Sequence, residues 1–163
     1  MILPNGVPAF DIPGTPEGLF PHISWCAQCQ MLSTEKRAVS LAMQAFWLEF
    51  SSNPRGHRLA GINILCIDSS EFSLQLDNDD EMGLALRIIV LPLHHWRRKA
   101  LSIPAMIICM LEELCHALYV TDDELEVEHL VLACARRLWP NACLSDLYNP
   151  HWKPDDKHPP VLK

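Results

Sequence analysis

The most constraining feature of the sequence is the stretch Ile103–Pro140, in which two predicted helices carry carboxylates into apolar surroundings. The first of them is apolar on every side over Met106–Leu111, which is typical of a helix that is buried all round. It nevertheless carries Glu112 and Glu113 side by side, with His116 following. Burying an ionised carboxylate among apolar side chains is costly unless a cation pairs with it. We therefore expect a cation, a metal ion or a chemical function at this helix.

The spacing of these residues favours a metal site. Glu112 and His116 are four residues apart, so their side chains share one face of a helix. If both bind a metal ion, Glu113 lies beside it and can act as the general base that takes a proton from water. The third ligand would come from the following acidic helix. Glu128 is the first choice for that ligand and His129 is the second.

This layout resembles the zincin metallopeptidases, whose signature is His-Glu-x-x-His on a buried helix, with a further ligand from a following helix. The segment Glu112–His116 is similar to that signature except at its first position, where Glu replaces His. Residues 126–140 look like the third-ligand helix of small phage- and mobile-element-associated metallopeptidases of the ImmA/IrrE type. The likeness covers residues 34–140. It implies a zincin-like fold, a bound Zn²⁺ and hydrolysis of peptide bonds in a protein or peptide partner.

The glutamate in place of the first histidine leaves the ligand set open. With His129 as third ligand, the usual set of two histidines and one carboxylate is restored in a different order. With Glu128, the set becomes two carboxylates and one histidine, which suits Mn²⁺ or other oxygen-preferring ions better and acidifies a bound water less. Such a site either turns over slowly or is a relic that holds no metal.

Two alternatives to a metallopeptidase follow from the same residues. Glu112 and Glu113 could instead pair with arginines across the core, and His116 could be an ordinary buried histidine bonded to a carbonyl oxygen. The arginines available for this are Arg97, Arg98, Arg136 and Arg137. Either outcome favours a non-catalytic interaction or inhibitor protein that has kept a zincin-like fold.

Hydrophobic periodicity predicts a single α+β domain. A helix capped by Ser33 or Thr34 should run to about Phe50, because its apolar residues recur at helical spacing. Short apolar or alternating runs predict three strands, at residues 59–67, 71–76 and 84–93. Pro92 indicates that the third strand ends at a sheet edge.

The expected architecture is a small three-stranded sheet with a packed N-terminal helix, the buried central helix and the following acidic helix. The acidic helix should begin at a capping box, Thr121–Glu124, and stop at Pro140. The positions of the prolines divide the chain into a proline-rich arm, a zincin-like core and a C-terminal tail. These parts are residues 1–32, 33–140 and 141–163.

A Cys-x-x-Cys motif, Cys26 and Cys29, closes the arm. With Trp25 before it, the motif resembles the thioredoxin active site, and Ile103–Pro104 is similar to the Ile-Pro segment of that fold. The buried strand that should precede such a motif is not predicted, because Pro21 interrupts the region. We interpret the pair as two incidental thiols before a helix and keep thiol exchange as a minor third function.

Composition excludes several other classes of partner. A net charge of −7 argues against a nucleic acid or an anionic membrane surface, and the basic run His94–Lys99 is interpreted as a solvated turn. No apolar run reaches the ~20 residues that a membrane-spanning helix needs, and no signal-peptide pattern is seen. Several cysteines lie within apolar segments, which is typical of reduced thiols. The prediction is a cytoplasmic protein.

Overall fold

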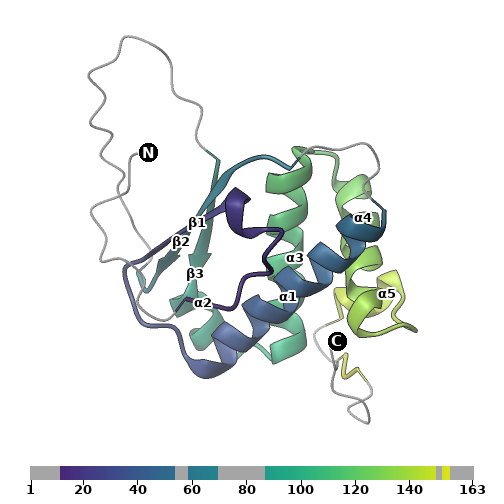
Figure 1. Cartoon of the computed structure of the whole chain (residues 1–163). Helices are drawn as coiled ribbons and strands as arrows, with labels where there is room; N and C mark the ends of the chain where they lie inside the picture. The colour runs from purple at the N-terminus through teal and green to yellow at the C-terminus, as the bar shows by residue number, and fades with distance from the viewer. Residues whose placement is uncertain (1–11, 54–58, 70–86, 150–151, 155–163) are drawn as a thin grey trace.

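A three-stranded parallel sheet and the helices packed against it make up the α+β fold of this protein (Figure 1). The computed structural model describes residues 12–53, 59–69, 87–149 and 152–154. The strands are β1 (Ile23–Ala27), β2 (Ile62–Ile67) and β3 (Ile88–Pro92). The helices are α1 (Ser33–Ser52), α2 (Leu93–Arg98), α3 (Ile103–Tyr119), α4 (Glu124–Leu138) and α5 (Leu144–Leu147), with a 3₁₀ turn at Phe20–His22.

The sheet has the order β1-β2-β3, and both pairs of neighbouring strands are parallel. Parallel neighbours need a crossover connection, and α1 supplies it between β1 and β2. Ile62, Ile64 and Cys66 of β2 join the main core with the helices, whereas Leu65 and Ile67 belong to a second apolar cluster. Burial on both faces explains why β2 is apolar at every position except Asn63, rather than alternating between apolar and polar residues.

The predicted α+β class and three-stranded sheet are confirmed, but the strands differ from those expected. The predicted strand 59–67 contains β2, and the predicted strand 84–93 contains β3, an edge strand of the described sheet that ends at Pro92. The predicted strand 71–76 lies outside the described residues. β1 was not predicted at all, because Pro21 was read as interrupting the region. In the structure that proline lies in the 3₁₀ turn before the strand.

Helix α1 begins one or two residues earlier than its predicted caps, Ser33 or Thr34, imply. Leu32 is the N-cap residue, and its backbone N–H donates a 2.7 Å hydrogen bond to Oε2 of Glu35. Ser33 and Thr34, the expected caps, are already helical. The run His94–Lys99 was interpreted as a turn, but most of it forms α2, because Leu93 and Trp96 bury one side of that helix.

Helix α3 is central: it packs against α1 and α4 and contacts β3. Its N-cap is Ser102, as expected, with the side chain accepting a hydrogen bond from the Ala105 N–H. The N-cap of α4 is Asp123 rather than Thr121, because the Asp123 carboxylate accepts from the N–H groups of Leu125 and Glu126. The two helices meet across a 119° bend.

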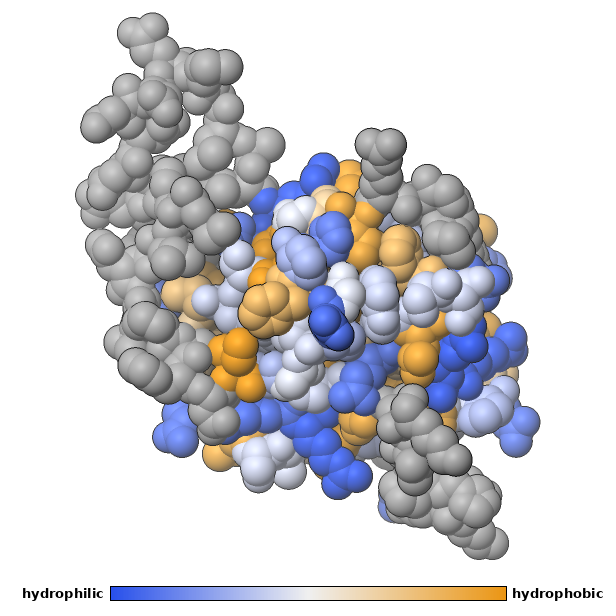
Figure 2. All heavy atoms as spheres, in the orientation of Figure 1, coloured by the Kyte–Doolittle hydropathy of each residue, from blue (hydrophilic) through white to orange (hydrophobic). Residues whose placement is uncertain are grey.

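No single described helix has both the length and the apolar composition to cross a membrane; only α3 and α4 taken together, across their bend, reach those values. Figure 2 shows hydrophobic and hydrophilic residues interspersed over the face seen in Figure 1. The C-terminal segment packs on α4 through Trp152, whose ring meets that of Trp139 edge to face at 4.9 Å between centroids.

Candidate metal centre

Three potential metal ligands meet at the corner between α3 and α4. A carboxylate oxygen of Glu112, a ring nitrogen of His116 and a carboxylate oxygen of Glu124 all lie within 4.8 Å of one another. The Nε2 atom of His116 lies 3.7 Å from Oε2 of Glu124. Glu112 and His116 are half-buried, and Glu124, the first residue of α4, is exposed. One cation placed among these atoms could reach all three side chains.

The orientation of His116 leaves the correct ring nitrogen available. Its Nδ1 lies 2.9 Å from the carbonyl oxygen of Thr121, so Nδ1 carries the proton and donates it to that oxygen. The lone pair of a neutral ring is then on Nε2, which lies 3.7 Å from Glu124 Oε2. A bond to a carbonyl was also the expectation for an ordinary histidine. Metal-binding histidines, however, almost always donate their other ring N–H in this way.

A strained turn holds that carbonyl in place. Val120 adopts the left-handed conformation, with φ 59° and ψ 49°, which is a rare conformation for a β-branched residue. Its N–H donates to the carbonyl oxygen of His116 and closes α3. The hydroxyl of Thr121 then donates a 2.7 Å hydrogen bond to Glu126 Oε2. The turn therefore fixes both the ring of His116 and the start of α4.

The carboxylates at this corner repel one another. The pKa of Glu112 is raised, first by burial and then by the charge of Glu113, with smaller contributions from Glu124 and Glu128, while His116 opposes the shift. Partial desolvation of its carboxyl group also raises the pKa of Glu113, although the residue as a whole is exposed, and His116 again opposes the shift. A cation bound at the corner would relieve this repulsion.

The structure brings together only some of the predicted site residues. Glu112 and His116 meet as their spacing predicted, but the third member of the group is Glu124. Glu128 lies one turn further along α4 and acts on Glu112 through its charge, and His129 is exposed at the next position. Both remain predictions as ligands. The sequence did carry a signal for Glu124, because it lies four residues before Glu128 on the same helix face.

Glu112 and Glu113 were expected to be buried, and this expectation is met only in part for Glu112 and is wrong for Glu113. Glu112 is half-buried and Glu113 is exposed. The carboxylates that are buried are those of Glu35 and Glu49, which are 2% and 6% exposed. Both belong to α1, and each is paired with an arginine.

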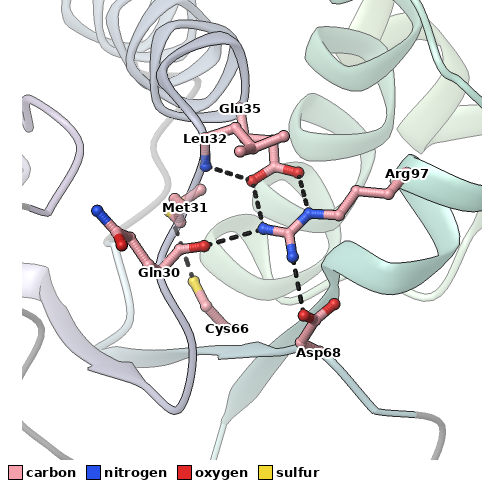
Figure 3. Close-up of polar contacts among 7 residues, drawn as sticks. All are labelled: Gln30, Met31, Leu32, Glu35, Cys66, Asp68 and Arg97. Atoms are coloured by element: carbon pink, nitrogen blue, oxygen red, sulfur yellow. Dashed lines mark hydrogen bonds and ion pairs between the residues drawn. The ribbon is translucent and has the colours of Figure 1, made fainter.

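Arg97 is the arginine that holds Glu35 (Figure 3). Its Nε and Nη2 donate to the two carboxylate oxygens of Glu35 at 2.8 and 3.0 Å. Nη1 donates to Asp68 Oδ2 at 2.9 Å, and Nη2 also donates to the carbonyl oxygen of Gln30 at 2.9 Å. One guanidinium therefore ties together the segment after β1, the start of α1, the end of β2 and α2.

The other candidate arginines also have partners away from the corner. Arg137 Nε donates to Glu49 Oε2 at 2.9 Å, and Arg136 Nε donates to the carbonyl oxygen of Ala142 at 3.0 Å. Arg98 contacts a ring nitrogen of His95 at 3.0 Å. Among the residues that the structure describes, no arginine pairs with Glu112 or Glu113. The arginine-paired alternative is therefore not what the described contacts show.

The thiols of the Cys-x-x-Cys motif are not activated. Cys26 lies on β1 and is buried, and Cys29 follows the strand and is half-buried. Burial raises the pKa of both thiols, and it raises the pKa of the neighbouring Cys66 to about 12. Thiol exchange needs the thiolate, so these shifts disfavour it at neutral pH.

In the part of the chain that the structure describes, the geometry thus brings together one group of side chains that could hold a metal ion. Comparison of the chain with protein family models, with curated proteins and with solved structures found no match.

Proposed function

We propose that this protein is a metal-dependent hydrolase of peptide bonds, similar to a minimal zincin in which the first histidine ligand has become glutamate. The observation that carries the proposal is the orientation of His116, whose Nδ1–H is held by Thr121 while Nε2 lies 3.7 Å from Glu124 Oε2, in a group that also contains Glu112. The donor set fits a divalent cation, because it combines one imidazole nitrogen with carboxylate oxygens. Glu112, His116 and Glu124 would hold the ion.

A bound divalent ion supplies a Lewis acid that polarises a carbonyl group and acidifies water. The residues around it supply the proton transfer and the orientation. Glu113 follows Glu112 directly and lies close enough to His116 for that ring to affect its pKa. Its raised pKa suits a general base that must later release the proton to the leaving amine. The exposed position of Glu113 leaves it accessible to substrate and water.

The composition of the donor set bears on which ion is held. Two carboxylates and one histidine form a harder set than two histidines and one carboxylate. Zn²⁺ is the ion that the zincin resemblance implies, and Mn²⁺ is the alternative that the oxygen ligands favour. Titration of the metal-free protein with each ion separates these possibilities.

The decisive experiment measures metal content and cleavage in matched variants. The wild-type protein should bind one divalent ion per chain, and His116→Ala should lose it, whereas His129→Ala, outside the group of three, should keep it. Glu124→Gln should weaken binding strongly, because it replaces a carboxylate ligand with a neutral amide, and Glu128→Gln should weaken it less. If His116→Ala and wild type both lack metal after titration with Zn²⁺ and Mn²⁺, the proposal is wrong.

Glu113→Gln separates catalysis from metal binding. This variant should keep its metal and lose cleavage of a quenched fluorogenic peptide library, because the amide cannot accept the proton. The alternative function is a non-catalytic interaction protein on the same fold. One observation favours it, because a ligand set with two carboxylates acidifies water less than the usual set. A metal-loaded wild type with no cleavage above the Glu113→Gln background would select that alternative.

A further inference from the structure

A small cavity opens between α3 and the C-terminal segment, next to the candidate metal centre. Its volume is about 160 Å³, well below the ~300–1,000 Å³ of sites for drug-sized ligands, so it fits a single side chain. Most of its walls are apolar, and one carboxylate side chain, that of Glu112, is part of its lining. The apolar walls include Pro104, Ile108, Leu147 and Trp152.

The charge around this cavity is strongly negative. Glu112 lines it, and Glu113, Glu124 and Glu128 all contribute to the electrostatic environment of Glu112. Within the described part of the chain, no lysine or arginine forms an ion pair with any of these four carboxylates. One divalent cation among the four would still leave a net charge of −2. The negative potential extends to the cavity wall, since burial and then the charges of Glu112 and Glu128 raise the pKa of Tyr148 to about 12.

We propose that this cavity binds a lysine or arginine side chain of a peptide substrate. The aliphatic stem of the side chain would pack against Ile108 and Leu147, and its cationic head would face Glu112 and Glu128. The indole of Trp152 adds a surface on which a cation is attracted to an aromatic ring. A purely apolar side chain would instead cover Glu112 without giving its carboxylate a partner, which is costly. The charge complementarity therefore selects a basic occupant.

This inference rests on the proposed function for cleavage but not for binding, because the carboxylates attract a cation with or without the metal. The test is an NMR titration of the full chain, metal-free and Zn²⁺-loaded, with N-acetyl-lysine methylamide and its norleucine analogue. Both probes have a four-carbon side chain, and only the first is charged. The lysine compound should bind at least tenfold more tightly, shift the Trp152 indole N–H signal and weaken as salt is added.

Two variants locate the binding site. Ala105→Leu fills the cavity and should abolish binding, whereas Ala133→Leu, the same change at a residue that does not line it, should leave binding unchanged. Glu128→Gln should weaken binding of the lysine compound several-fold and leave the norleucine compound unaffected. Equal binding of the two probes, or binding that Ala105→Leu and Glu128→Gln both leave unchanged, would overturn the inference.

The same samples separate this inference from the proposed function. If Zn²⁺ does not bind while lysine is still preferred over norleucine, the hydrolase proposal fails and the basic pocket remains. If Zn²⁺ binds at Glu112, His116 and Glu124 but lysine is not preferred, the pocket inference alone fails.

Discussion

Glu35 and Glu112 both lie on helices that pack in the core, but their surroundings differ in kind. Glu35 is 2% exposed and accepts two hydrogen bonds from Arg97 and one from the Leu32 N–H. Glu112 is half-buried and shares its corner with other carboxylates and one histidine. The first region is electrostatically satisfied, and the second is not.

The difference shows how to separate structural from functional carboxylates in this chain. A buried carboxylate that is fully hydrogen-bonded to an arginine holds elements together. Carboxylates that raise one another's pKa around an oriented histidine have no structural benefit in the metal-free protein, and such clusters occur at functional sites. In this chain the most deeply buried carboxylates are therefore the structural ones. Among the described residues, the carboxylates without a positively charged partner are those that indicate a candidate functional site.

The largest expected effect is at the satisfied region. Arg97→Met should destabilise the protein by about 3–5 kcal/mol, because it leaves the buried charge of Glu35 without a partner. Chemical denaturation at pH 7 measures this loss. Arg98→Met, on the same helix but exposed and in contact with His95, is the control and should change stability by less than about 0.5 kcal/mol. Similar stability of the two variants would contradict the role of Arg97.

A smaller loss is expected at the second arginine pair. Arg137→Met removes the guanidinium from Glu49, but Asn53 Nδ2 still donates a 3.0 Å hydrogen bond to Glu49 Oε1. The carboxylate is therefore not left unpartnered, and we expect a loss of about 1–3 kcal/mol. The double variant Arg137→Met, Asn53→Ala should lose clearly more stability than the sum of the losses in the two single variants. Simple additivity would show that Asn53 does not compensate.

The sequence predicted the helices of both regions better than their contacts. Apolar periodicity and the Ser102 cap locate α3, and the four-residue spacing pairs Glu112 with His116. The partner of Glu35 could not be predicted, because Arg97 is 62 residues away and no local pattern links the two.

Glu124, the third member of the group at the corner, was missed for a related reason. Helical spacing places Glu124 and Glu128 on one face of α4, and the bend between α3 and α4 decides which of them meets His116. That bend depends on the left-handed conformation of Val120, which the sequence does not indicate, because such a position normally favours glycine. The strand β1 was missed because its partner β2 is distant in the chain, and local alternation carries no information about parallel pairing.

The strained turn offers a third test of the comparison. Val120→Gly should stabilise the protein by about 1 kcal/mol, because the left-handed conformation costs a β-branched residue more than the added chain entropy costs glycine. The looser turn should also weaken metal binding. Ala100 also has positive φ, at 48°, and follows α2 away from the corner, so Ala100→Gly is the matched control. It should raise stability without changing metal affinity, and a parallel fall in affinity in both variants would argue against a positioning role for Val120.

The smallest expected effect concerns Glu112 itself and has the opposite sign to that of Arg97→Met. Because the pKa of Glu112 is raised in the folded protein, its ionised form destabilises the metal-free fold above the raised pKa, and the effect vanishes below the ordinary value of 4.5. Glu112→Gln should therefore increase the free energy of unfolding of the metal-free protein at pH 7, by less than about 1 kcal/mol given the partial exposure of Glu112. This gain should appear as a higher thermal midpoint at pH 7 and should be absent at pH 4.

Removing a charge from an exposed residue of the same turn, Asp122→Asn, should give no such gain. With saturating Zn²⁺ the wild type should become more stable than Glu112→Gln, because the ion binds only the folded state and so stabilises it. The variant gains less from the ion, because it offers one ligand fewer. Glu112 would then contribute to stability as Glu35 does, with the metal ion in the place of the arginine. A Glu112→Gln variant that is less stable than wild type at pH 7 without metal would show instead that this carboxylate already has a partner.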